Sequence, residues 1–101
     1  MNKKASSSTK AKPFPMAKIA NAIKAALPSD RGFKIKIVNS GVGDAKIVRI
    51  VTDAWKSKRP TERIQRVLRA VNPKLTEDEQ WSVLRYSVLT EKEYQRLVEE
   101  D

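Results

Sequence analysis

The feature that most constrains the fold is a strictly alternating segment at residues 33–37. In Phe33-Lys34-Ile35-Lys36-Ile37 every second residue is apolar and the two residues between are lysines. This is the period of a β-strand with one buried and one solvated face. Segment 39–44 follows with two glycines suited to a hairpin turn, and the β-branched segment 47–52 is typical of a returning strand. We therefore expect an antiparallel hairpin whose apolar face is covered by helices.

Helical periodicity before and after the hairpin predicts that cover. Residues 16–27 carry apolar side chains at helical spacing. Pro60 suits the first turn of a second helix, because its missing N–H is not needed there. A core-facing stripe follows in this helix, made of Ile64, Val67, Leu68 and Val71.

Two capping boxes mark the rest of the chain. Thr76 with Glu79 predicts a short helical turn, and Thr90 with Glu93 predicts a last helix. Between them, residues 82–88 return to alternation. The predicted order is α-β-β-α-(short α)-β-α, an α+β fold with a three-stranded sheet and helices packed on one face. We expect the large aromatic side chains of this half in the core, namely Trp81, Tyr86 and Tyr94.

The chain divides into an arm and one domain. Residues 1–15 contain four Lys, three Ser and two Pro without an acidic residue, a composition that favours a disordered basic arm. Residues 16–101 form the expected single domain. The arm has no apolar run of signal-peptide length, and no segment has that of a membrane span. We therefore expect a soluble, cytoplasmic protein that does not enter membranes, with the oligomeric state left open.

Composition excludes most catalytic and metal chemistry. The chain has no Cys and no His, so thiolate sites, disulfides and the commonest near-neutral general base are missing. Most acidic residues lie in first turns or at the C-terminus, where capping and the helix dipole account for them. We expect no catalytic residues, no metal site and no cofactor, and hence a protein that is not an enzyme.

The charge distribution points to a polyanionic partner. The chain has 21 Lys and Arg against 12 Asp and Glu, a net charge of +9. Residues 1–75 carry 18 basic and 4 acidic side chains, a net of +14, and residues 76–101 carry a net of −5. Such asymmetry favours binding of nucleic acid, RNA or DNA.

The densest basic motif is Trp55-Lys56-Ser57-Lys58-Arg59-Pro60, continued along the helix by Arg63 and Arg66. Arg59, Arg63 and Arg66 have the spacing of one helical stripe near an N-terminus, where positive charge opposes the helix dipole. A phosphate there would be attracted by the side chains and the dipole together. A solvated helix face accounts for the same pattern. Trp55 is either a base-stacking platform or a core residue.

The sheet offers a second candidate surface. If the apolar residues of 33–37 face the helices, Lys34 and Lys36 point outward, and Arg49 and Arg85 are placed to join them. These residues form either a basic platform for nucleic acid or the ordinary polar face of a one-sided sheet. We rank them below the loop and helix residues.

The predicted order and several motifs resemble BolA-like proteins and type II KH domains. The stretch 48–55, Val-Arg-Ile-Val-Thr-Asp-Ala-Trp, is similar to the BolA strand that ends in Ser-Asp-Ala-Phe. Arg63 falls where that family has the Arg of its Arg-His pair, and segment 90–94 is similar to its Thr-Pro-Glu-Glu-Trp close. The likeness covers residues 16 to about 97 and implies a KH-like fold with nucleic-acid binding.

The departures from the family remove one of its functions. Ile64 stands where the family's helix His would join a glutaredoxin-bound iron–sulfur cluster, and the second expected His falls near Trp81. In place of the Gly-x-x-Gly loop of KH domains we find the basic segment 56–59. The alternative to nucleic-acid binding is therefore a BolA-type regulatory module that binds a protein partner without iron–sulfur ligation.

Overall fold

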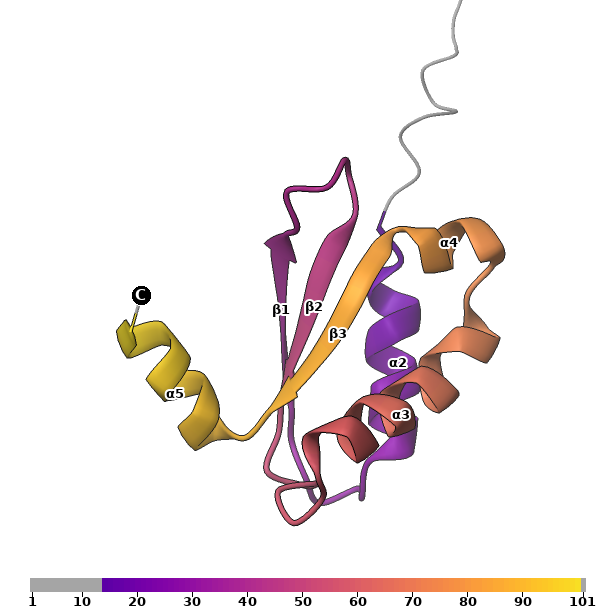
Figure 1. Cartoon of the computed structure of the whole chain (residues 1–101). Helices are drawn as coiled ribbons and strands as arrows, with labels where there is room; N and C mark the ends of the chain where they lie inside the picture. Colours follow the sequence, from indigo (N-terminus) through magenta and orange to yellow (C-terminus); the bar gives the residue numbers. More distant parts are fainter. Residues whose placement is uncertain (1–13, 101) are drawn as a thin grey trace, which may run out of the picture.

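The computed structural model describes residues 14–100, and the predicted arm lies outside these residues except for Phe14 and Pro15. The order of helices and strands confirms the predicted α+β fold (Figure 1). The elements are α2 (Met16–Ala26), β1 (Lys34–Asn39), β2 (Lys46–Val51), α3 (Pro60–Val71), the 3₁₀ turn η1 (Asn72–Lys74), α4 (Glu77–Trp81), β3 (Val83–Leu89) and α5 (Glu91–Glu100). No helix within this range is long and apolar enough to cross a membrane.

The strands form one mixed sheet in the order β1–β2–β3. β1 and β2 pair antiparallel, from Lys34 opposite Val51 to Asn39 opposite Lys46, which confirms the predicted hairpin. Gly41 in its turn has a φ of 82°, a conformation that a side chain would strain. β3 pairs parallel to β2, as the crossover through α3 and α4 allows.

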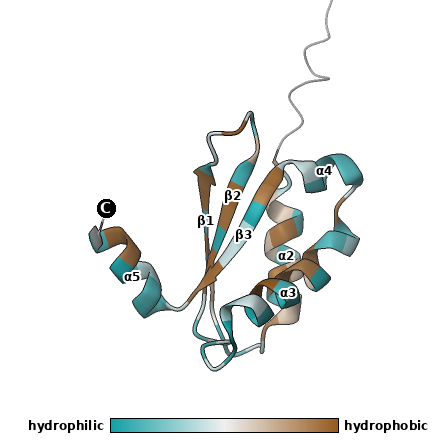
Figure 2. Cartoon of the chain, viewed as in Figure 1, coloured by the Kyte–Doolittle hydropathy of each residue, from teal (hydrophilic) through white to brown (hydrophobic). Residues whose placement is uncertain are grey.

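The core lies between the sheet and the two longest helices. α2 and α3 pack on one face of the sheet, and hydrophobic residues colour long stretches of the strands and parts of both helices (Figures 1 and 2). The fully buried members of this core are Ile19, Ile23, Val48, Ile50, Val67 and Val71. Packing of these stripes gives the short helices most of their stability, because isolated helices of this length are marginal in water.

The prediction that the helices pack on one face holds for α2 and α3 but not for α5, which lies on the other side of the sheet (Figure 1). Its first residue, Glu91, donates its backbone N–H to Asp53 Oδ1 at 3.1 Å, and Glu91 also pairs with Lys34 of β1 at 3.5 Å. Val51, at the end of β2, is fully buried although it lies outside the main core cluster. One end of this sheet face is therefore covered and the rest is open.

Both predicted capping boxes are present. The backbone N–H of Thr76 donates to Glu79 Oε1 at 2.8 Å, and that of Glu79 donates to Thr76 Oγ1 at 3.2 Å. Thr90 and Glu93 exchange the same two bonds, at 2.8 and 3.1 Å. These bonds satisfy backbone donors that the first turn of a helix leaves free.

The prediction that Trp81 lies in the core is wrong. Trp81 is 77% exposed and Leu84, just beyond it, is 49% exposed. The reason is that α4 has only five residues and buries none of them, so Leu75, which precedes α4, fills the core there. Tyr86 is buried as expected, and Tyr94 is partly exposed.

The Tyr86 hydroxyl is buried without a hydrogen-bond partner among residues 14–100, and burial raises the pKa of Tyr86 to about 12. Removal of this group should therefore cost nothing. We expect Tyr86→Phe to leave the free energy of unfolding unchanged or to raise it by up to about 1 kcal/mol, measured by urea denaturation. Val88→Ala, a cavity control on the same strand, should lose about 2 kcal/mol. A loss in Tyr86→Phe as large as that in the control would contradict the assignment.

Candidate nucleic-acid interface

Arg63, the middle residue of the predicted stripe, is a buried anchor of the basic loop. It is only 5% exposed. Its Nε donates to the carbonyl oxygens of Trp55 and Lys58, both at 3.0 Å, and its Nη2 donates to that of Lys56 at 3.2 Å. The expectation that Arg63 offers its guanidinium to nucleic acid is therefore wrong, because these donors are engaged inside the protein.

The same guanidinium also links the loop to β3 and to α5. Arg63 Nη1 donates to the Val88 carbonyl at 3.4 Å and to Glu93 Oε1 at 2.9 Å. The pKa of Glu93 is lowered, first by the N–H of Thr90 and also by Arg63, although partial burial acts in the opposite direction. Arg63 therefore joins the loop, the end of β3 and the capping box of α5.

The loop around this anchor directs its basic side chains outward. The carbonyls of residues 55, 56 and 58 point inward to Arg63. Lys56 and Arg59 are exposed, and Lys58 is partly exposed. Because the loop carbonyls accept hydrogen bonds from Arg63, the loop presents side-chain cations rather than backbone acceptors to a ligand.

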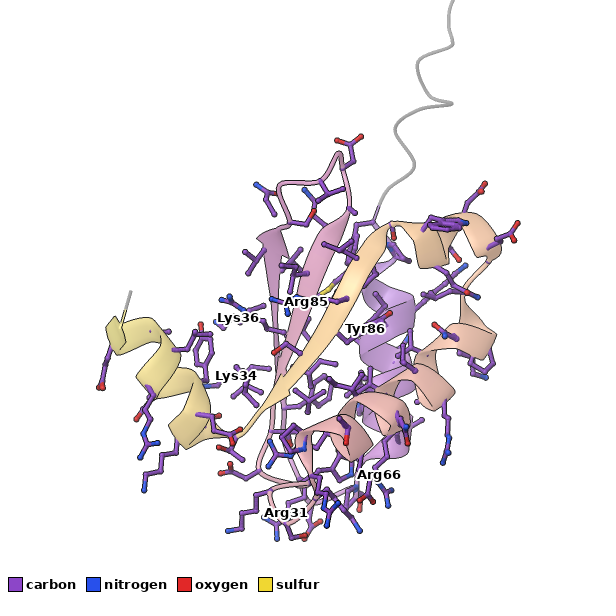
Figure 3. All side chains as sticks on the ribbon, in the orientation of Figure 1. Arg31, Lys34, Lys36, Arg66, Arg85 and Tyr86 are labelled. Carbon is purple, nitrogen blue, oxygen red and sulfur yellow. The ribbon has the colours of Figure 1, made fainter. Side chains whose placement is uncertain are left out.

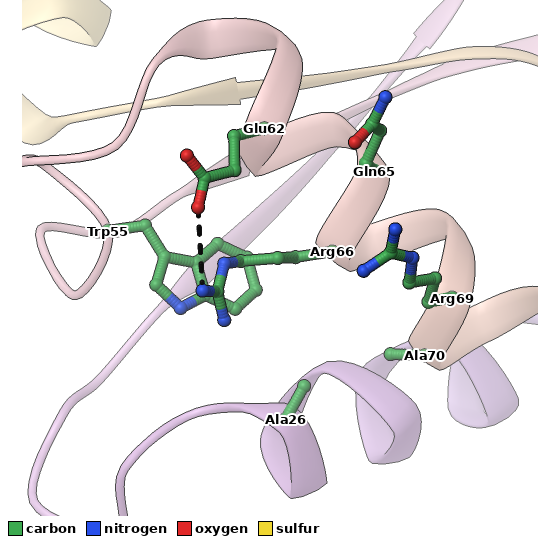
Figure 4. Close-up of a pocket in the computed structure, with 7 residues that line it drawn as sticks. All are labelled: Ala26, Trp55, Glu62, Gln65, Arg66, Arg69 and Ala70. Carbon is green, nitrogen blue, oxygen red and sulfur yellow. Dashed lines mark hydrogen bonds and ion pairs between the residues drawn. The ribbon is translucent and has the colours of Figure 1, made fainter.

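Trp55 is a core residue and not a free stacking platform. Only 5% of it is exposed, because it packs in the hydrophobic core. Its remaining surface lines a groove between α2 and α3 (Figure 4). The groove has a volume of about 380 Å³, and two arginines of α3, Arg66 and Arg69, line it. Figure 3 places Arg66 at the same end of the molecule as Arg31.

A single carboxylate lies among the cations of this region. Glu62 pairs with Arg66 at 3.5 Å and with Lys58 at 3.7 Å. Within the described part of the chain, Lys56, Arg59 and Arg69 have no carboxylate partner. We name these cations together the loop–helix surface: Lys56, Lys58, Arg59, Arg66 and Arg69. Exposed pairs such as those of Glu62 are weak, so all five remain available to a polyanion.

The sheet surface predicted from the alternation is also present. Lys36 of β1 lies directly opposite Arg49 of β2, and Arg49 lies opposite Ser87 of β3. Side chains two residues apart share a face, so Lys34 and Arg85 lie on this face as well, and Figure 3 shows Lys34 and Lys36 directed toward α5. We name Lys34, Lys36, Arg49 and Arg85 the sheet surface.

Sequence reasoning missed two basic residues near these surfaces. Arg31 is exposed in the connection between α2 and β1. Arg96 of α5 lines a cavity together with Arg49 and Arg85. No local pattern distinguishes either residue from other surface arginines, and only the fold brings them close to the predicted sites.

The comparisons with known proteins leave the sequence resemblance untested. No family model matches the chain, and no curated protein or solved structure matches it significantly. The likeness to BolA and KH proteins therefore stays a prediction. Among residues 14–100, no group of three acidic side chains is arranged to hold a metal ion.

Replacement of Arg63 should destabilise the fold. Arg63→Met leaves four carbonyls and the Glu93 carboxylate without their donor, so we expect a loss on the order of 3 kcal/mol in the free energy of unfolding. Arg66→Met removes only an exposed pair and should change it by less than about 0.5 kcal/mol. Urea denaturation of both variants measures the difference. Equal stabilities would mean that Arg63 is not the anchor described here.

Glu93 should also make stability depend on pH. Its folded pKa is lowered, so its contribution is present above the pKa of the unfolded chain and is lost as the pH falls through the folded pKa. We expect Glu93→Gln to be less stable than the wild type at about pH 7 and to approach the wild-type stability as the pH falls through the lowered pKa of Glu93. Glu99→Gln, on the same helix, is the control. A stability gap that persists in acid contradicts a role for the carboxylate charge.

Proposed function

We propose that this chain is a small, non-enzymatic domain that binds nucleic acid through its phosphates, mainly on the loop–helix surface. The observation that carries the proposal is the imbalance of charge there. Five basic side chains lie on one loop and one helix, and one carboxylate, that of Glu62, lies among them. A surface selected for stability alone would alternate charges, because exposed like charges repel.

The start of α3 adds a second argument. Arg59 is its N-cap residue and accepts no backbone N–H with its side chain. α4, in contrast, begins with a full capping box. Helix N-termini attract anions through their free N–H groups and dipole. Basic residues at such an end are unfavourable until an anion binds between them and the helix.

The proposal agrees with the rest of the sequence evidence. The resemblance to KH-like proteins implies nucleic-acid binding, and the basic loop at 56–59 replaces glycines with side-chain cations. Phosphate contacts of this kind set affinity and position without reading sequence. We therefore expect weak discrimination among base sequences.

Oligonucleotide binding measured against salt tests the proposal. If four to six phosphates are engaged, the logarithm of affinity should fall with the logarithm of salt at a slope of about −3 to −5. Lys56→Ala/Arg59→Ala should bind about tenfold more weakly and should reduce the steepness of that slope by about 1.5. Both residues are exposed and unpaired within the described chain, so the fold should persist. Fluorescence anisotropy with a labelled oligonucleotide provides the measurement.

Two further variants make this test specific. Lys46→Ala/Lys74→Ala removes the same charge away from the loop, from the first residue of β2 and from η1 after the end of α3, and it should weaken binding much less. Glu62→Gln releases Lys58 and Arg66 from their carboxylate, and it should strengthen binding. Absent or salt-independent binding at about 50 mM salt would falsify the proposal, since phosphate contacts are salt-sensitive.

A protein-interaction module is the second candidate function. The exposed Trp81 and Leu84 favour it, because aromatic and apolar side chains on a surface are typical of protein interfaces. A partner that survives nuclease and high salt, and that Trp81→Ser releases, would support this function over nucleic-acid binding.

A further inference from the structure

A cleft on the open side of the sheet, opposite the helix groove, gathers arginines from three elements. Arg49 of β2, Arg85 of β3 and Arg96 of α5 line a cavity of about 350 Å³. Its other walls are Ser87, Leu89, Glu93 and Leu97. We infer that this cleft between the sheet surface and α5 is a phosphate-binding site separate from the loop–helix surface.

The pairing of the strands shows that stability does not explain these charges. Lys36 and Arg49 are direct cross-strand partners, and like charges in that arrangement are destabilising. Arg85 lies two residues before Ser87, the partner of Arg49 on the next strand, so it adds a third charge to the same face. An anion placed among them converts this repulsion into attraction.

The acidic residues nearby do not neutralise the arginines. Glu93 lines the cleft, but its Oε1 accepts hydrogen bonds from the Arg63 guanidinium at 2.9 Å and from the backbone N–H of Thr90 at 2.8 Å. Glu91 pairs with Lys34 at 3.5 Å. Among the described side chains, those of residues 14–99, no carboxylate lies within pairing distance of Arg49, Arg85 or Arg96. The cleft therefore keeps a net positive charge.

The chemistry of the lining favours phosphate over a single carboxylate. Each guanidinium presents planar donors that match phosphate oxygens in pairs, and the Ser87 hydroxyl adds one more donor. Leu89 and Leu97 supply apolar walls beside these donors. Three arginines suit a group with two or more negative charges.

The position of Arg96 is set by the anchor described above. The capping box at Thr90 and Glu93 and the contact from Arg63 hold the first turn of α5. Arg96 follows Glu93 by three residues, about one helical turn. The cleft is thus built from rigid strands on one side and from a helix fixed at its N-terminus on the other.

Inorganic tripolyphosphate is the first probe, because it carries the phosphate chemistry without bases or sugar. Calorimetry should show binding to the wild type and at least a tenfold loss in Arg49→Thr/Arg85→Thr. Removal of like charges should leave the melting temperature of this variant unchanged or higher at low salt. Unchanged tripolyphosphate affinity in this folded variant would overturn the inference.

A milder pair of variants covers the case in which the strand variant fails to fold. Arg96→Gln should lose several-fold in tripolyphosphate affinity, whereas Lys92→Gln, an exposed neighbour on α5, should not. Equal losses in the two would overturn the inference, since they would reflect net charge alone. Lys56→Ala/Arg59→Ala should keep tripolyphosphate binding at the cleft, which separates this site from the proposed function.

The source of the phosphate is decided by two more probes. A nucleic-acid strand is the source of the phosphate if the proposed function holds, and this inference rests on that function. In that case a single-stranded oligonucleotide should compete with tripolyphosphate and should bind more weakly to Arg49→Thr/Arg85→Thr. If tripolyphosphate binds the cleft and the oligonucleotide does not compete with it, the site stands and its ligand is a free phosphate compound. A poly-glutamate peptide that binds the cleft as tightly as either probe would overturn the choice of phosphate.

Discussion

The buried guanidinium of Arg63 is the interaction on which the rest of this structure depends. It donates hydrogen bonds to the inward carbonyls of the loop at 55–58 and to the carbonyl at the end of β3, and it pairs with Glu93 of α5. A buried charge is costly unless hydrogen bonds satisfy it, and here they do. Because the loop turns its carbonyls inward, its basic side chains face outward. The residue predicted to bind phosphate instead positions the exposed cations of the loop.

The two basic surfaces lie on opposite sides of the sheet and have a common origin in that anchor. The loop–helix surface begins at the loop that Arg63 organises, and the cleft includes α5, whose first turn Arg63 also contacts. In both places, cations outnumber the carboxylates within reach. Folding alone gains little from such arrangements, and we propose phosphate groups as the partner of both surfaces.

Local signals in the sequence predict most of the fold but only part of the site. The hairpin and both capping boxes follow from short-range rules, since a turn, a strand period and a helix start each involve a few neighbouring residues. Burial of Arg63 does not follow, although it lies four residues before Val67 on the buried stripe of α3. A charged residue at such a position is buried only when distant carbonyls meet it. The predicted burial of Trp81 is wrong for the opposite reason, because its short helix α4 has no face packed against the core.

The central claim is that exposed, unneutralised cations on this scaffold bind phosphate. A ¹H–¹⁵N NMR titration of the full chain with a short single-stranded oligonucleotide tests it most directly, because every backbone amide reports on its own surroundings. The account predicts shifts grouped on residues 56–59 and the first turn of α3, with a second group around Arg49, Arg85 and Ser87. Shifts confined to Trp81 and Leu84, or no shifts at low salt, would contradict it.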